Sequence, residues 1–149
     1  MDVTVTTPEG TSPTSSADHF TYIAAPTVTG LSPTSGPAAG GTLVTITGTN
    51  FTGASVVDFG TTVATDVTVV SSTEITADSP AGSGVVDVTV TTPGGTSPTS
   101  SADKFTYIAA PTVTGLSPTS GPAAGGTLVT ITGTAFTGAT AVEIGRAHV

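Results

Sequence analysis

The chain has 149 residues and a formal net charge of −8, because ten acidic side chains stand against only two basic ones, Lys104 and Arg146. So few cations cannot neutralise many phosphates, which argues against nucleic-acid binding and against docking on an anionic membrane surface. The sequence has no cysteine, which excludes disulfides, thiolate metal sites and cysteine catalysis, and no apolar run is long enough to span a membrane.

The chain is an internal repeat. The segment from Asp2 to Gly60 recurs from Asp87 to Gly145, 85 positions later, with seven exchanges. The exchanged pairs are Glu9/Gly94, His19/Lys104, Asn50/Ala135, Ser55/Thr140, Val56/Ala141, Asp58/Glu143 and Phe59/Ile144. We therefore predict three copies, of which only the second, at 26–110, is complete. The first, at 1–25, holds the C-terminal strands of a repeat. The third, at 111–149, holds the N-terminal part of a repeat. The joints, "AAP", are short and end in proline, which suits stiff connections.

The first copy begins with the strand-like "DVTVTT" and continues into the Ser/Thr-rich "TSPTSSAD". Met1 stands where the repeat has Val86, so the chain starts inside a predicted strand, which we do not expect of a natural domain boundary. With the rest of its domain missing, this copy should expose Val3, Val5 and Phe20.

Residues 36–42 read "GPAAGGT", and Gly36 to Gly41 match the first six positions of the nucleotide-binding pattern G-x-x-x-x-G-K-S/T. In that pattern the lysine supplies charge, and a following helix supplies N–H groups and a positive dipole. Here Thr42 replaces the lysine, and "LVTIT" alternates with a period of two. We therefore interpret the segment as a turn in which Gly36, Gly40 and Gly41 adopt positive φ, and not as a nucleotide site.

Alternation predicts strands through the complete copy. In "TLVTITGT", Val44 and Ile46 share one face, while Thr45 and Thr47 share the other. The other inward positions are predicted to be Val57 and Phe59, Ile75 and Ala77, Val86, Val88 and Val90, and Phe105 and Tyr107. Six to eight short strands in such a unit, separated by turns such as "SPTSGP" and "SPAGSG", predict an all-β sandwich.

The acidic residues of the complete copy are scattered singly and form no D-x-D-x-D-G loop. They are Asp58, Asp66, Glu74, Asp78, Asp87 and Asp103. We interpret them as solvated side chains and turn caps, with weak Ca²⁺ binding near a joint by Asp18 or Asp103 as the alternative. Because His19 is replaced by Lys104 in the other copy, the repeat does not require an imidazole there. We predict no catalytic residue, no cofactor and no metal site.

Two possible modification sites have simpler interpretations. Asn50-Phe51-Thr52 is a glycosylation sequon, but Ala135 removes it from the third copy, so we interpret Asn50 as a turn residue that tolerates the left-handed region. The Ser/Thr-rich stretch "TSPTSSAD", at 11–18 and again at 96–103, is interpreted as a solvated loop, with O-glycosylation as the alternative.

The C-terminal residues depart from the repeat, which predicts "VDFGTTVAT" from Val142 where the chain reads "VEIGRAHV". One back-translation of "EIGRAHV" reads as a sequencing adapter. Our hypothesis is that 143–149, which include His148, are a non-native tail.

The stretches "PTVTGLSPTSGPAAGGTLVTITGTNF", "VVDFG", "STEITADSP", "GVVDVTVTTPGGTS" and "FTYI" closely resemble the IPT/TIG family. The resemblance covers the complete copy and both incomplete ones. It implies an immunoglobulin-like sandwich of the early-set type, used as a module inside larger proteins. Family members that touch DNA carry basic loops, which this chain lacks. Near-identical, Thr-rich, acidic tandem copies resemble the bacterial surface or secreted type.

We therefore expect no enzyme but a structural or interaction module, a fragment of a tandem array in a bacterial cell-surface or secreted protein, acting as a spacer or adhesion stalk. Its expected partners are the neighbouring repeats and a protein or carbohydrate at a cell surface, with no nucleic acid and no membrane insertion by this segment. The alternative is an accessory, carbohydrate-binding domain of a secreted enzyme. A sugar platform needs exposed aromatic rings, so exposure of Tyr107 would favour the alternative.

Overall fold

The computed structural model describes residues 1–145, and the last four residues of the predicted tail, including Arg146 and His148, lie outside the described residues. The chain divides after Tyr107 into two compact units. Within residues 1–145, no helix is long and apolar enough to cross a membrane.

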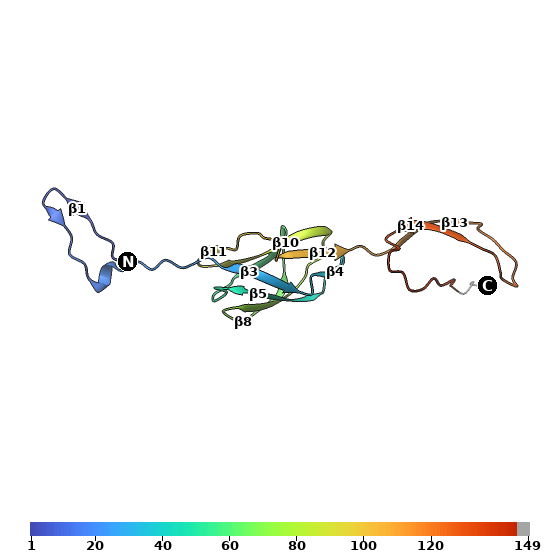
Figure 1. Ribbon diagram of the computed structural model, residues 1–149, viewed down its shortest axis with the longest axis horizontal. Helices are drawn as coiled ribbons and strands as arrows, with labels where there is room; N and C mark the ends of the chain where they lie inside the picture. The colour runs from blue at the N-terminus through green and yellow to red at the C-terminus, as the bar shows by residue number, and fades with distance from the viewer. Residues whose placement is uncertain (146–149) are drawn as a thin grey trace. The chain divides into compact units, whose positions relative to one another are not determined.

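The first unit contains a sandwich of two sheets (Figure 1). One sheet has the strand order β3 (Thr27–Ser32), β5 (Leu43–Thr49), β9 (Glu74–Asp78) and β8 (Thr65–Ser71). The other has the order β4 (Ser35–Pro37), β12 (Lys104–Ile108), β10 (Gly84–Thr92), β6 (Val56–Phe59) and β7 (Thr62–Val63), and β11 (Gly95–Thr96) pairs with β10. The prediction of an all-β sandwich is confirmed.

The core lies between the two sheets and contains every predicted inward position except Val86, which is only partly buried, together with Val28, Phe51 and Ala64, which were not among those positions. The fully or nearly fully buried apolar side chains are Val28, Val44, Ile46, Phe51, Val57, Phe59, Ala64, Ile75, Ala77, Val88, Val90, Phe105 and Tyr107. Phe105 makes edge-to-face contacts with the rings of Phe59 and Tyr107, at centroid distances of 5.1 and 5.2 Å. Burial of this apolar surface from both sheets is the main source of stability.

The turn at 36–42 is confirmed, but one of its glycines has a different role. Gly40 and Gly41 have φ of 81° and 78°, as expected. Gly36 lies in β4, within the predicted turn "SPTSGP", and does not have positive φ. A Cβ at Gly36 would lie 2.2 Å from Thr42 Oγ1 and 3.1 Å from Phe105 Cζ, so this glycine permits close packing over the core.

The alternation does not predict five strands of the complete copy, β3, β4, β7, β8 and β11. Three of them, β4, β7 and β11, have only two or three residues, too few to show alternation. β3 contains a bulge between Val28 and Gly30, which breaks the alternation of its side chains. All residues of β8, at one edge of its sheet, are exposed, so neither of its faces shows the alternation of buried and exposed positions that predicts a strand.

The incomplete copies keep local pieces of the same fold. In the first copy, β1 (Thr6–Thr7) and β2 (Gly10–Thr11) pair as β10 and β11 do, and a 3₁₀ turn, η1, covers Ser16–Asp18. Val3, Val5 and Phe20 are exposed, as predicted. In the second unit, β13 (Thr112–Ser117) pairs with β14 (Thr130–Thr134) in the register of β3 and β5, including the bulge.

Candidate functional site

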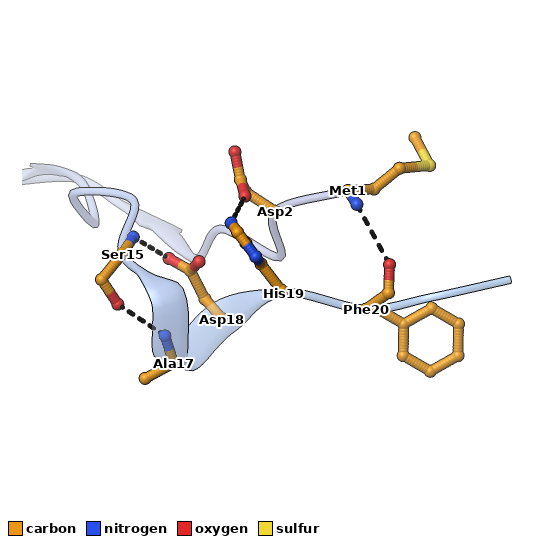
Figure 2. A network of polar contacts seen from close by, with 7 residues as sticks. All are labelled: Met1, Asp2, Ser15, Ala17, Asp18, His19 and Phe20. Atoms are coloured by element: carbon orange, nitrogen blue, oxygen red, sulfur yellow. Dashed lines mark hydrogen bonds and ion pairs between the residues drawn. The ribbon is translucent and has the colours of Figure 1, made fainter.

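One group of side chains has the composition of a ligand site. Among residues 1–145, Asp2, Asp18 and His19 are the one set of three metal-ligating side chains whose ligand atoms all lie within 4.8 Å of one another. We call this set the Asp2 cluster. His19 Nε2 lies 2.8 Å from Asp2 Oδ1, and both side chains are accessible to solvent (Figure 2).

The η1 turn fixes the third member of the Asp2 cluster. The backbone N–H of Ser15 donates to Asp18 Oδ2 at 2.9 Å, and the N–H of Ala17 donates to Ser15 Oγ at 3.2 Å (Figure 2). This reciprocal capping holds the Asp18 carboxylate by one oxygen. The other oxygen, Oδ1, is buried and has no hydrogen-bond partner among the described residues.

Backbone pairing brings the two halves of the Asp2 cluster together. The N–H of Val3 donates to the carbonyl of Asp18 at 2.8 Å, and the N–H of Phe20 donates to the carbonyl of Met1 at 2.7 Å. Asp2 and His19 therefore face each other across an antiparallel bridge.

The complete copy repeats this arrangement with one exchange. Asp87 on β10 lies opposite Lys104, the first residue of β12, and Asp103 precedes it. The backbone N–H of Ser100 donates to Asp103 Oδ2 at 2.8 Å, and the N–H of Val88 donates to the Asp103 carbonyl at 2.8 Å, as in the first copy. We call Asp87, Asp103 and Lys104 the Asp87 cluster. Its lysine forms an ion pair with Asp87, where the Asp2 cluster has His19.

Asp103 is a turn cap, as predicted, but the prediction that it is solvated is wrong. The residue is 0 % exposed, and its Oδ1 has no hydrogen-bond partner within residues 1–145. Burial raises the pKa of the Asp103 carboxyl, which the Ser100 N–H opposes and the neighbouring Asp87 carboxyl reinforces. The hydrogen bond from Lys104 lowers the pKa of Asp87. The two carboxyls of one cluster are thus shifted in opposite directions.

The shifted pKa of Asp103 predicts a specific dependence of stability on pH. Because the pKa is raised in the folded chain, the unfolded chain loses this proton first as the pH rises. The contribution of Asp103 to the free energy of unfolding therefore falls above about pH 4, the ordinary aspartate value. Asp103→Asn should remove this decline, so the variant should be more stable than the parent at pH 7 and equally stable near pH 3.

Urea denaturation at pH 3, 5 and 7 measures this difference. Asp58→Asn, which removes one negative charge outside the cluster, is the matched control. A loss of stability at pH 7 in Asp103→Asn would contradict the expectation.

The stretch 96–103 is more buried than a solvated loop. Ser97 is 4 % exposed, and its hydroxyl accepts a hydrogen bond of 3.0 Å from the N–H of Val90. With Asp103 buried at the other end, the prediction of a solvated loop is wrong at both of these residues.

The joint before the complete copy, at Ala24 and Ala25, contacts two loops of that copy. Asn50 has φ of 58°, which confirms it as a turn residue in the left-handed region, and its Nδ2 donates to the carbonyl of Ala25 at 3.0 Å. A Cβ at Gly94 would lie 2.2 Å from the carbonyl oxygen of Ala24. In the third copy, Ala135 adopts φ of 56° without an amide that could form such a bond.

Within the complete copy, residues 26–107, the aromatic side chains form no exposed platform for sugar rings. In residues 26–107 all four of them, Phe51, Phe59, Phe105 and Tyr107, are at most 6 % exposed. Burial also raises the pKa of the Tyr107 hydroxyl, which has no hydrogen-bond partner among the described residues.

The sequence presents Asp18 and Asp103 as separate candidates and does not indicate that Asp2 and His19 lie beside Asp18. The missing step is the antiparallel pairing of Asp2 with His19 and of Asp87 with Lys104, which are 17 positions apart in each copy. A signal was present: the position occupied by His19 and Lys104 carries a basic residue in both copies, and an aspartate lies opposite it.

The model of the IPT/TIG domain family matches residues 26–107 and 111–149. None of the curated proteins matches this chain. Among solved structures, the full extracellular region of plexin A4, domains 1 to 10, is 31 % identical with a TM-score of 0.51, over 62 % of this chain and 8 % of that one. A second structure of this region, with domains 1 to 8, has a sequence identity of 31 % and a TM-score of 0.49. The match covers 56 % of this chain and 8 % of that one. SGBP-B from a complex xyloglucan utilization locus in Bacteroides uniformis has a sequence identity of 28 % and a TM-score of 0.44. The match covers 50 % of this chain and 21 % of that one. The chain thus spans a small part of each of these proteins.

Proposed function

Because this chain belongs to the IPT/TIG domain family, we propose that it is a fragment of a tandem array of immunoglobulin-like modules, in which each module acts as a rigid spacer or adhesion stalk. The fold is an immunoglobulin-like sandwich. The non-catalytic interaction role and the spacer or stalk role are the parts that we propose.

The single observation that carries this proposal is the repetition itself. The copies differ at only seven of the positions compared from Asp2 to Gly60, a segment that includes many exposed residues. A surface repeated with so few changes favours a mechanical task shared by all copies over a single specialised binding site. Stability and reach then depend on the number of modules and on the joints.

The joints support a semi-rigid array. β12 ends at Ile108 and β13 begins at Thr112, so Ala109, Ala110 and Pro111 alone connect them. A connection this short, with φ of one residue fixed by proline, restricts bending far more than a glycine-rich linker does.

We further propose that the array belongs to a bacterial surface or secreted protein and that its partners are neighbouring repeats and cell-surface molecules. The resemblance to tandem bacterial repeats supports this location, as does the likeness to an extracellular region of plexin A4. Because the chain has no cysteine, the module has no disulfide, and its stability depends on its hydrophobic core alone.

The alternative, a carbohydrate-binding accessory domain, has less support. Its discriminating feature was an exposed Tyr107, and that side chain is 6 % exposed inside the core. Stacking of a sugar on this ring would require the sandwich to open.

Small-angle X-ray scattering on arrays of two, four and six complete copies tests the proposal. The maximum dimension should grow by a constant increment for each copy. In a matched set, replacing each Ala-Ala-Pro joint by a twelve-residue Gly/Ser linker should reduce this growth towards the square-root dependence of a flexible chain. Square-root growth with the native joint would contradict the proposal.

A further inference from the structure

We propose that the Asp2 cluster is a binding site for a divalent transition-metal ion of the Zn²⁺ class, and that the exchange of His19 for Lys104 closes the same site in the complete copy. The sequence alone led us to expect no metal site. The inference is independent of the spacer role, because it concerns one position that differs between copies with the same backbone.

The donor set of the Asp2 cluster suits such an ion. Two carboxylates and one imidazole are ligands that Zn²⁺ and its first-row neighbours accept, and three protein ligands leave a fourth position for water. In tetrahedral coordination with bonds of about 2.0–2.1 Å, ligand atoms lie about 3.4 Å apart. His19 Nε2 and Asp2 Oδ1 are 2.8 Å apart, and all three ligand atoms lie within 4.8 Å, so small side-chain movements complete the geometry.

A second observation is the carboxylate oxygen that no donor reaches. Asp18 Oδ1 is buried without a hydrogen-bond partner, while Oδ2 is held by the N–H of Ser15. The same oxygen of Asp103 is also unpartnered, in a residue that is 0 % exposed. A buried carboxylate oxygen without a donor is costly unless a cation lies nearby. Both copies therefore keep one buried carboxylate oxygen that no donor among the described residues reaches.

The complete copy contains that cation within its own sequence. The ammonium of Lys104 forms an ion pair with Asp87, and its charge also favours the ionised form of Asp103. The imidazole of His19 offers a lone pair at the corresponding position and, when neutral, supplies no charge to the two carboxylates. The Asp2 cluster thus keeps the acidic pair of the Asp87 cluster and exchanges an internal cation for a metal ligand.

The test uses the full chain without a polyhistidine tag, titrated with Zn²⁺ in competition with a chromophoric chelator at pH 7.5. The parent chain should bind one equivalent through the Asp2 cluster. His19→Lys, which installs the residue of the other copy, should weaken binding at this site by more than about 100-fold, beyond the loss typical of removing an outer-shell partner. His148→Ala controls for the second histidine of the chain and should bind as the parent does.

The reciprocal variant tests gain of a site. Lys104→His should bind a second equivalent of Zn²⁺, and Zn²⁺ should raise the Tm of the complete copy in this variant and leave that of the parent unchanged. Imidazole resonances in an NMR spectrum should shift for His19 in the parent and additionally for the introduced histidine in Lys104→His.

Equal binding by the parent and His19→Lys would overturn the proposal, because the histidine would then not be a ligand. A folded Lys104→His chain that binds no additional Zn²⁺ would also overturn it. If that variant does not fold, the comparison of the parent with His19→Lys decides alone. Stronger binding of Ca²⁺ than of Zn²⁺ by the parent would show a carboxylate site for hard cations and would contradict the assigned class.

Discussion

Replacing Phe105 by alanine is expected to lower the free energy of unfolding of the complete copy by about 3–5 kcal/mol. The side chain is 0 % exposed and lies between the rings of Phe59 and Tyr107. Its removal leaves a cavity and breaks both edge-to-face contacts. A domain of this size has a total stability of about 4–13 kcal/mol, so the variant should unfold at a much lower urea concentration. Thermal unfolding should shift by about 12 °C or more.

The repeat supplies a matched control for this variant. Phe20 is the counterpart of Phe105 in the first copy and is 52 % exposed, because the rest of that sandwich is missing. Phe20→Ala should leave the unfolding transition of the complete copy unchanged. Equal effects of the two substitutions would show that Phe105 does not contribute through burial.

Replacing Gly48 by alanine should be nearly as damaging. Gly48 is buried in β5, and a Cβ there would lie 1.9 Å from the carbonyl oxygen of Thr27 and 2.4 Å from Phe51 Cζ. The backbone oxygen cannot move aside without opening the pairing of β3 with β5. We expect a loss of about 3 kcal/mol or more in the free energy of unfolding, at the upper end for an overpacked site. Urea denaturation of the full chain measures it.

Gly41→Ala separates this steric effect from the backbone preference of glycine. Gly41 has φ of 78°, and nothing lies within 4 Å of a Cβ placed there. This variant should therefore lose about 1 kcal/mol, the usual cost of a non-glycine residue in the left-handed region. If Gly41→Ala proved as destabilising as Gly48→Ala, the contact with Thr27 would not be the cause.

The parts of the fold that the sequence predicts are those in which burial alternates along a strand. Val44 and Ile46 on β5, and Val88 and Val90 on β10, are apolar at every second position because that face meets the core. The sequence does not predict β8, because both faces of that strand are exposed. It does not predict β3, because the bulge in that strand shifts the alternation of its side chains. Alternation of apolar and polar residues indicates a strand with one buried face. It does not reveal a strand that is exposed on both faces or interrupted by a bulge.

The candidate site is predictable only in part for a different reason. Asp18 and Asp103 are each followed by a basic residue, which the sequence shows, but the distance to Asp2 or Asp87 depends on strand pairing. The burial of Asp103 depends on the complete sandwich around it. Neither quantity is a property of neighbouring residues in the chain, so spacing alone could not predict it.

The pairing of β13 with β14 has a consequence for how a long array reaches its folded state. This pair forms in the incomplete third copy with the register and bulge of β3 and β5, and the Thr112 and Thr134 hydroxyls are hydrogen-bonded at 2.6 Å as their counterparts are at 2.8 Å. The pairing of the opening strands of a copy thus does not require its remaining strands. Those remaining strands, when they emerge from the ribosome, fit the opening strands of a near-identical neighbour as well as their own. Strand exchange between copies is thus the characteristic misfolding hazard of such a chain, and the number of competing partners rises with each repeat added.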